Sequence, residues 1–445
     1  MNNKRSGKGE IFIRRVPVIL CYSLLLFFVF PTSFKAESLT IQQQIDEANP
    51  GDTIQLDAGV YVENINIDKP VHIIGGKDVI IQNSSQQPIV SIQDSNIILE
   101  NITLQYQTAD IDSSAILVKG TNNVLKNLHI DTNSYGIRLD QADDNELSEI
   151  TITGKKNIPL NNRQHGIDVW KSHNNFIHNT HITDVQDGIY VESSNKTAIY
   201  SNYVSNSRYG YHLMFTENTS LEQNESYENI SGMMVMGTDG TKVKNNIIKY
   251  NQKNVQSLGL LLFDVNDATI TENEIAHNRI GIFFEDSSNN NLSSNVVQNN
   301  FIGIQFKRAK NNTITHNAFT ANVVQGQAEE SANNNTNRNY WGDHLGLDTT
   351  GDKISNLTYE IDPFYLHLTN EYPPYRLLFH SPGMLFLEQL LHTPVDERLA
   401  DLSPLMENPL AGASTRTGNQ AAVLLCSSIL LGMSITIILM GARKQ

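Results

Sequence analysis

Apolar and polar positions recur along this chain with a period of 22 residues. A glycine marks each repeat at this spacing: Gly166, Gly188, Gly210 and Gly232, then Gly259, Gly281 and Gly303. The steps that lead to Gly166 and Gly259 are longer by eight and five residues, and the phase continues unchanged after each insertion. A fixed period of this length is typical of a solenoid, in which insertions form loops between stacked turns.

The pattern after each glycine predicts a strand that faces the core on one side. Residues one and three positions after the glycine are apolar, whereas those two and four positions after it are mixed. Because side chains alternate along a strand, the apolar columns point inward and the mixed columns point outward. A second short strand is expected around Ile199, Leu221 and their equivalents. The sequence therefore predicts an all-β protein, a right-handed parallel β-helix over residues 37–365.

The polar residues between the strands also recur in phase. An asparagine stands 14 residues after the glycines, as at Asn202, Asn224 and Asn246. Stacked asparagines can hydrogen-bond to the turns above and below, so we expect this column to be structural. Residues 39–48 can form a short amphipathic helix that caps the first turn, and residues 339–343 close the repeats. A helical tail and linker is expected over residues 366–419.

Both ends of the chain carry apolar segments. Residues 16–30 follow a basic stretch and are too few to span a bilayer, which predicts a signal peptide over residues 1–36. Residues 421–440 carry no charge and precede Arg443 and Lys444. This pattern predicts a transmembrane helix over residues 420–441 and a cytoplasmic tail over residues 442–445. We therefore expect an exported protein, anchored on the extracytoplasmic face of the cell membrane.

Composition limits the classes of partner and site. Charged residues make up 18% of the chain and the net charge is -15, so no overall basic surface is available for nucleic acid. The two cysteines, Cys21 and Cys426, lie in the terminal apolar segments. Disulfides and cysteine-based zinc sites are thereby excluded from the predicted β-helix.

Four side chains with soft donor atoms are expected to meet on the outward face. His212 and Met214 follow one glycine by two and four positions, and Met234 and Met236 occupy the same positions one repeat later. Adjacent parallel strands are about 4.8 Å apart and alternate residues about 6.5 Å apart, so the four groups are close enough to bind one ion. Thioether and imidazole ligands favour copper, Cu(I) in particular. The alternative is that methionine only fills gaps in the packing.

Three outward apolar residues, Leu261, Phe263 and Phe283, follow on the next turns. A contiguous exposed apolar strip is typical of a docking surface. Its place beside the candidate metal site suggests transfer of an ion between proteins. The alternative is that the insertion before Gly259 folds over this strip.

Many β-helices act on polysaccharides, and this is the competing class. Lyases and hydrolases need carboxylates grouped on one face, with calcium and a basic residue or as a pair of acids. No outward column stacks two carboxylates on adjacent turns beside an arginine. The acidic residues near this face are instead scattered: Asp168, Asp187, Glu192, Asp264 and Glu285. We therefore predict no catalysis, with a cell-surface polysaccharide lyase, epimerase or carbohydrate-binding β-helix as the alternative.

Several segments resemble NosD, the β-helical extracytoplasmic maturation protein of nitrous-oxide reductase. They are residues 208–215 (RYGYHLMF), 232–236 (GMMVM), 259–262 (GLLL), 339–341 (NYW), 372–374 (YPP) and 404–406 (PLM). The resemblance extends in order from about Ile41 to Met406. It implies a part in denitrification, the supply of copper, with or without sulfur, to the copper centres of nitrous-oxide reductase.

The resemblance also implies partners and roles. The partners are an ABC-type ATPase and permease, a membrane-anchored copper chaperone and nitrous-oxide reductase itself. His212, Met214 and Met236 match the family's His and Met positions, whereas Met234 rests on geometry alone. Two features depart from the family. NosD proteins are typically soluble in the periplasm, and they usually carry a lysine where this chain has Phe263.

The apolar segment over residues 372–391 is the part that the resemblance assigns to contact with the permease. It begins with Tyr372, Pro373 and Pro374. We expect these three residues to belong to the partner-docking surface.

Overall fold

The computed structural model describes residues 39–361 except Lys77 and Ile111, residues 399–411, and the single positions Leu368, Glu371, Tyr372, Pro374, Tyr375 and Gly383. The chain divides into two units, Met1–Thr40 and Ile41–Gln445, and every described helix and strand belongs to the second. The predicted signal peptide, transmembrane helix and cytoplasmic tail lie outside the described residues, as does much of the predicted helical tail. No helix within these described ranges is long and apolar enough to cross a membrane.

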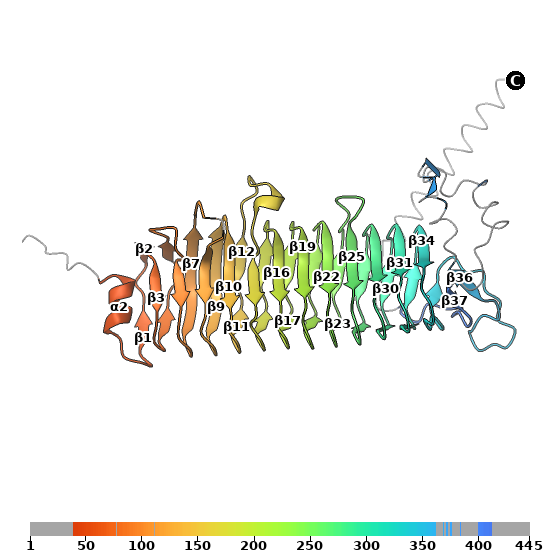
Figure 1. Cartoon of the computed structure of the whole chain (residues 1–445), viewed down its shortest axis with the longest axis horizontal. Coiled ribbons are helices and arrows are strands. Elements are labelled where there is room, and N and C mark those ends of the chain that lie inside the picture. Colours follow the sequence, from red (N-terminus) through yellow and green to blue (C-terminus); the bar gives the residue numbers. More distant parts are fainter. Residues whose placement is uncertain are drawn as a thin grey trace, which may run out of the picture. The chain divides into compact units, whose positions relative to one another are not determined.

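Parallel strands stack into a right-handed β-solenoid of about 13 turns, which confirms the predicted all-β architecture (Figure 1). A typical turn contributes three short strands, as in β14 (Phe176–His178), β15 (His181–Thr183) and β16 (Asp187–Glu192). The first two belong to a twenty-three-stranded sheet and the third to a twelve-stranded sheet, counted over the described residues.

The twelve-stranded sheet contains the strands that follow the repeated glycines. In spatial order they are β3 (Ile65–Ile67), β6 (Val90–Ile92), β8 (Ser114–Val118), β10 (Tyr135–Asp140), β13 (Ile167–Trp170), β16, β19 (Tyr209–Met214), β22 (Ser231–Met236), β25 (Leu258–Phe263), β28 (Ile280–Glu285), β31 (Ile302–Lys307) and β34 (Val324–Glu329).

The other parallel strands form the twenty-three-stranded sheet. They are β1 (Thr53–Gln55), β2 (Gly59–Val62), β4 (His72–Ile74), β5 (Val79–Gln82), β7 (Ile98–Tyr106), β9 (Val124–Thr132), β11 (Glu146–Ser148), β12 (Thr151–Thr153), β14, β15, β17 (Ala198–Tyr200), β18 (Tyr203–Ser205), β20 (Ser220–Glu222), β21 (Glu225–Tyr227), β23 (Lys242–Lys244), β24 (Ile247–Lys249), β26 (Thr269–Thr271), β27 (Glu274–Ala276), β29 (Asn291–Ser293), β30 (Val296–Gln298), β32 (Thr313–Thr315), β33 (Ala318–Thr320) and β35 (Tyr340–Trp341).

Close approach between successive turns explains the repeated glycine. A Cβ atom at Gly210 would lie 2.7 Å from the carbonyl oxygen of Gly232, and one at Gly232 would lie 2.4 Å from that of Gly259. A larger residue would therefore push adjacent turns apart. Because each turn from Gly136 to Gly303 repeats this contact, the period in the sequence sets the register of this part of the stack.

The inward columns form one continuous core, as predicted. Their members from successive turns are fully buried: Ile167, Ile189, Tyr211, Met233, Leu260, Ile282 and Ile304. The asparagine column is also structural, since the amide oxygen of Asn246 accepts hydrogen bonds from the backbone N–H (2.8 Å) and Nδ2 (3.2 Å) of Asn224. From Asn202 to Asn339 the ladder satisfies buried polar groups from one turn to the next.

Both ends of the solenoid are covered. Helix α2 (Ile41–Glu47) buries Ile41 and Ile45 against the first turns, as expected for a cap. At the other end β36 (Tyr359–Ile361) pairs antiparallel with β37 (Leu399–Asp401), so a strand lies within the segment predicted as tail and linker. The Asp401 carboxylate accepts hydrogen bonds from Trp341 Nε1 at 3.0 Å and from the Asn339 backbone at 2.9 Å.

The two insertions in the repeat form loops before strands of the twelve-stranded sheet. The first contains the 3-10 turn η1 (Leu160–Asn162) and leads to β13, and the second, residues 251–257, leads to β25. Both project from the same side of the solenoid (Figure 1). The turns that carry β16, β19 and β22 lie between them.

Candidate functional site

The four residues of the candidate metal site lie side by side on the outward face of the twelve-stranded sheet. His212 and Met214 are on β19, Met234 and Met236 are on β22, and the two strands are parallel neighbours. The register pairs His212 with Met234 and Met214 with Met236. The predicted juxtaposition is therefore present in the backbone, because a whole repeat separates the members of each pair. We name these four residues the His/Met cluster.

The outward orientation of the four side chains does not leave all of them exposed. His212 and Met234 are each 7% exposed, whereas Met214 and Met236 are half-buried. Parallel strands hold long outward side chains only about 4.8 Å apart, so neighbouring chains cover one another. The cluster is thus a shielded patch rather than an open surface.

Asp187 lies beneath this cluster and was not predicted as part of it. It is 0% exposed, and its carboxylate accepts hydrogen bonds from Arg208 Nε at 2.8 Å and Nη2 at 2.6 Å. His212 Nδ1 lies 2.9 Å from the carboxylate oxygen Oδ2. Burial by itself would raise the pKa of Asp187, but the hydrogen bonds from His212 and Arg208 outweigh it and lower the pKa to about 2. The carboxylate is therefore ionised at neutral pH.

The ionised carboxylate decides which nitrogen of His212 carries the proton. A carboxylate in this state only accepts hydrogen bonds, so Nδ1 must donate. In the neutral ring the lone pair is then on Nε2. That atom is buried and has no hydrogen-bond partner within the described part of the chain. A buried nitrogen left unpaired is costly, and it points to a role beyond packing.

Tyr190, on β16, borders the cluster on the preceding turn. Its hydroxyl lies 2.8 Å from Glu192 Oε2 and 3.4 Å from the Met214 sulfur. Its ring centroid lies 4.9 Å from that of His212 and 4.6 Å from that of His165. Met214 and His212 are therefore each held from the side by this tyrosine.

His165 is a second buried histidine on this face. Its Nδ1 lies 3.7 Å from Asp187 Oδ2, and this atom also has no hydrogen-bond partner among the described residues. Burial disfavours the charged ring and lowers its pKa to about 4, although Asp187 opposes the shift. His165 is therefore neutral at pH 7.

Asp168 and Arg138 form a similar ion pair on the neighbouring turns, away from the His/Met cluster. Arg138 Nε lies 3.1 Å from Asp168 Oδ2, and Asp168 is buried. Burial raises the pKa of Asp168 to about 6, and Arg138 opposes this shift. Asp187 differs from Asp168 in that it accepts side-chain hydrogen bonds from both His212 and Arg208, and these lower its pKa.

The apolar strip continues directly from the cluster. Leu261 and Phe263 pair in register with Met234 and Met236, and Phe283 follows Leu261 on the next strand. Leu261 is 6% exposed, so the expectation of an exposed strip is wrong at this position, while Phe263 and Phe283 are half-buried.

The other residues of the predicted docking surface, Tyr372, Pro373 and Pro374, follow the last strand of the solenoid in the sequence. Tyr372 and Pro374 are exposed, and Pro373 lies outside the described residues. The insertion before Gly259 reaches back to an earlier turn, where Lys253 Nζ lies 3.4 Å from Asn206 Oδ1.

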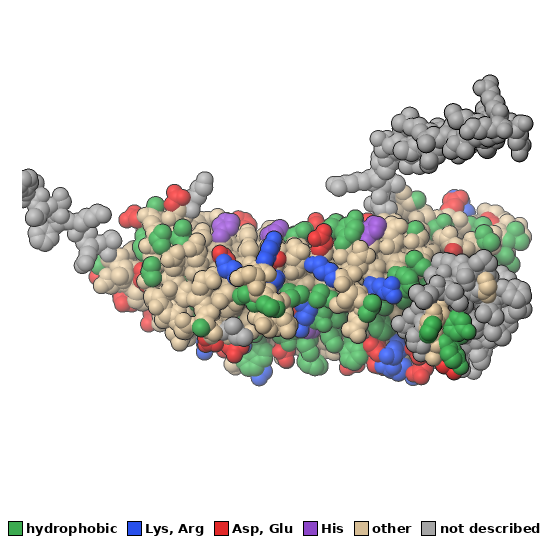
Figure 2. All heavy atoms as spheres, turned by 90° about the horizontal axis from the view of Figure 1, so that it is seen from above, with side chains coloured by type: hydrophobic (Ala, Val, Ile, Leu, Met, Phe, Trp, Pro, Cys, Tyr) green, Lys and Arg blue, Asp and Glu red, His purple; other side chains and the backbone are tan. Residues whose placement is uncertain are grey.

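The described residues show neither a cluster of His, Cys, Asp and Glu side chains nor, on the face drawn in Figure 2, a basic patch. Over the described residues, no group of three or more His, Cys, Asp or Glu side chains is placed to hold a metal ion. The Lys and Arg side chains on the face drawn in Figure 2 are scattered and form no continuous patch. The first result leaves the methionine-containing cluster as the metal candidate among the described residues.

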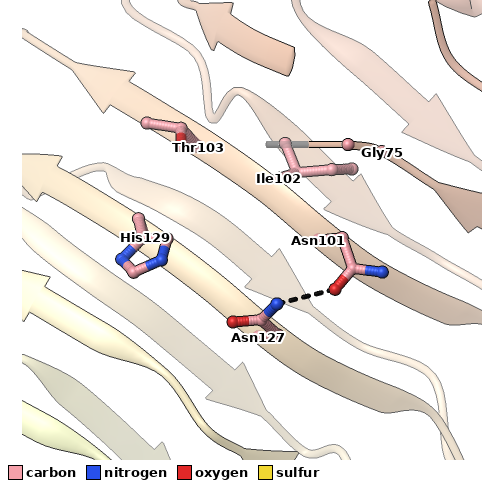
Figure 3. A pocket seen from close by; sticks show the side chains of 7 residues that line it. Gly75, Asn101, Ile102, Thr103, Asn127 and His129 are labelled. Atoms are coloured by element: carbon pink, nitrogen blue, oxygen red, sulfur yellow. Dashed lines mark hydrogen bonds between the residues drawn. The ribbon is translucent and has the colours of Figure 1, made fainter. Parts of the chain in front are cut away.

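A separate hollow lies near the first turns of the solenoid (Figure 3). Gly75, Ile102, His129 and an asparagine pair line it, with Asn127 Nδ2 donating to Asn101 Oδ1 at 2.7 Å. His129 is exposed there. We assign this hollow no function.

Comparison with known proteins agrees with the resemblance seen in the sequence. Residues 148–351 match the family described as periplasmic copper-binding protein (NosD). This segment contains the whole His/Met cluster, Asp187 and the apolar strip, but not Tyr372–Pro374. No curated protein matches the chain.

Several solved structures are similar to parts of this chain. A family 28 exopolygalacturonase of Yersinia enterocolitica matches with a TM-score of 0.50 at 11% identity, over 66% of this chain and 74% of the other. A mannuronic acid specific family 6 polysaccharide lyase from human gut microbiota gives 0.49 at 14%, over 66% and 80%. The periplasmic alginate epimerase AlgG gives 0.45 at 14%, over 69% and 81%. At these identities the likeness concerns the fold alone.

Proposed function

We propose that this chain is an extracytoplasmic copper-binding maturation factor, because residues 148–351 match the NosD family. It receives Cu(I) as cargo and helps to assemble the copper centres of nitrous-oxide reductase. The observation that carries this proposal is His212 Nε2, a buried nitrogen without a partner among the described residues, in register with Met234.

The donor set of the cluster suits Cu(I). One imidazole nitrogen and three thioether sulfurs are soft, uncharged ligands, which prefer Cu(I) to zinc or calcium. The carboxylate bonded to His212, that of Asp187, is already paired with Arg208. It is therefore not free to bind a divalent ion. His212, Met214, Met234 and Met236 would hold the ion, and the surrounding apolar side chains would keep water away from it.

The proposal extends to partners. We expect the ion to arrive from a membrane-anchored copper chaperone and an ABC-type ATPase and permease to drive the cycle. The apolar strip of Leu261, Phe263 and Phe283 adjoins Met234 and Met236, so a protein docked there would lie next to the cargo. Tyr372, Pro373 and Pro374 would contact the permease, and residues 420–441 would anchor the chain in the membrane.

Anaerobic Cu(I) titration of the full-length protein in detergent, against a chromophoric competitor, tests the site. We expect one tight Cu(I) ion per wild-type chain and loss of that ion when His212, Met214 and Met236 are replaced by alanine. Gln305 and Lys307 occupy the same outward columns further along the sheet, so a Gln305→Ala/Lys307→Ala variant is the matched control. Equal binding by the triple variant and the control would show that the cluster is not the site.

The second candidate is a polysaccharide lyase or epimerase, because a similar fold occurs in an exopolygalacturonase and because His165, Tyr190 and Asp187 are acid–base groups on one face. A uronate substrate needs a free cation for its carboxylate. Arg138 and Arg208 are each paired with a buried aspartate, so neither is free. Release of unsaturated uronide from pectin or alginate would support this alternative.

A further inference from the structure

Asp187 contacts His212, and Arg208 contacts Asp187, although neither residue lies in the same outward column as His212. Asp187 lies on β16 in the column before the repeated glycine, and the register places it opposite Tyr209, not His212. Its side chain nevertheless reaches diagonally to His212 Nδ1, at 2.9 Å. It is completely buried, so the contact has no competition from bulk water.

Arg208 fixes the charge of this aspartate. Its Nε and Nη2 atoms donate one hydrogen bond to each carboxylate oxygen, the two-point geometry that guanidinium groups form with ionised carboxylates. Both oxygens therefore act as acceptors. The oxygen shared with His212 leaves Nδ1 only the role of donor, and the Nε2 lone pair of the neutral ring is free.

Aromatic rings restrict the same histidine. Tyr209 meets the His212 ring edge to face at 5.1 Å, and the Arg208 guanidinium lies over the Tyr209 ring at 4.5 Å. Tyr190 lies on the preceding strand, β16, and its ring centroid is 4.9 Å from that of His212. Rotation of His212 would break the Asp187 bond and these ring contacts together.

From this geometry we propose that Asp187 and Arg208 are a positioning pair, which holds His212 in one ring orientation and one tautomer with Nε2 presented to the cargo ion. The inference rests on the proposed function, since it names the residues that prepare the same site. Asp187 does not touch the ion. Its negative charge strengthens the imidazole as a ligand, and Arg208 cancels that charge for the site as a whole.

The chain supplies a matched control for this role. Asp168 is also a buried aspartate on the outward side of the twelve-stranded sheet and also pairs with an arginine, Arg138. Asp168 has no hydrogen bond to His212. Asp168→Asn therefore reproduces the loss of a buried ion pair without disturbing the positioning of the ligand.

The experiment compares full-length wild type with Asp187→Asn, Asp187→Asn/Arg208→Gln and Asp168→Asn. Nitrogen-15 NMR of histidine-labelled, copper-free protein reports the His212 tautomer, with the signal assigned through His212→Gln. Anaerobic competition titration reports Cu(I) affinity. The double variant leaves no unpaired arginine beside the altered residue, so it serves if Asp187→Asn alone does not fold.

We expect His212 in wild type and Asp168→Asn to be a single Nδ1–H tautomer, and Asp187 variants to show mixed tautomers. Cu(I) affinity should fall about 10- to 100-fold in the Asp187 variants and stay within about twofold in Asp168→Asn. An unchanged tautomer and affinity in a folded Asp187 variant would overturn the positioning role. If wild type shows the single tautomer and the variants lose it, but none binds Cu(I), the positioning pair stands and the copper function fails.

Discussion

Met234 lies directly across from His212 on the adjacent parallel strand, and both side chains are almost completely buried although they point away from the core. The two residues are one repeat apart in sequence. An outward position that is shielded by its own neighbours provides a dry site on the surface of a solenoid. A soft ion held there would be protected from water and still lie one side chain away from a docked protein.

Two adjacent methionines provide the sharpest test of this arrangement. Met233 points into the core and Met234 points outward, and leucine matches methionine closely in volume. We expect Met234→Leu to weaken Cu(I) binding because it removes a thioether donor. Met233→Leu should leave binding unchanged, and each variant should lose less than about 1.5 kcal/mol of unfolding free energy. Equal Cu(I) affinities of the two variants in competition titration would exclude Met234 as a ligand.

The asparagine ladder makes a prediction about stability. Asn246 accepts from Asn224 and donates through Nδ2 to the Leu221 carbonyl at 2.8 Å and to Asn273 Oδ1 at 2.9 Å. Asn246→Ala leaves several buried groups unsatisfied, so the unfolding free energy should fall by about 2–4 kcal/mol. Denaturant unfolding measures this. The exposed Asn291 is the control, and its alanine variant should change stability by less than about 0.5 kcal/mol.

The sequence predicted the fold and the pairing in the His/Met cluster for one physical reason. In a parallel stack with a constant period, residues one repeat apart become neighbours, so spacing alone placed His212 beside Met234. Diagonal contacts between neighbouring strands cannot be predicted from this spacing. Asp187 reaches His212 through its side-chain rotamer, and Arg208 acts from just outside β19, so neither shares a column with the ligand.

The repeat pattern in the sequence also did not predict how deeply the outward residues are buried. Alternation says which way Leu261 points, but its 6% exposure depends on how the long chains beside it lean. A signal for Asp187 was nonetheless present in the sequence. An acidic residue stands in the column before the glycine, one turn before an arginine and a histidine. A parallel register brings such residues close enough to form an ion pair.

Phe215 is a bulky residue in an unusual backbone conformation, directly after Met214. Its φ is +54°, in the left-handed region, and its side chain is 59% exposed. Asparagine adopts this region more easily. We therefore expect Phe215→Asn to leave the unfolding free energy unchanged or to raise it by up to about 1 kcal/mol, as measured by urea unfolding. A loss of more than about 1 kcal/mol would mean that ring packing against Gly237 outweighs the backbone strain.

Two buried groups on this face should act on stability with opposite signs as the pH falls. The pKa of His165 is about 4 in the folded chain, against 6.5 for an ordinary histidine, so the unfolded chain binds the proton first. The stability that His165 contributes is complete above about pH 6.5 and is lost as the pH falls toward 4. The pKa of Asp168 is about 6, above the ordinary 3.8, so the folded chain binds that proton first. Acidification from pH 6 toward 4 therefore favours the folded state through Asp168.

Between pH 7 and pH 5 these two effects on the unfolding free energy partly cancel in the wild-type protein. A variant that removes one of the two groups should reveal the effect of the other. Asp168→Asn leaves His165 alone, so this variant should lose about 2 kcal/mol of unfolding free energy when the pH falls from 7 to 5, which is about 1 kcal/mol more than wild type loses. His165→Phe keeps a ring against Tyr190 and leaves Asp168 alone, so it should gain stability by about 1 kcal/mol as the pH falls. Urea unfolding at the two pH values measures both. Parallel pH profiles for the two variants would show that neither pKa is shifted as the burial of these groups requires.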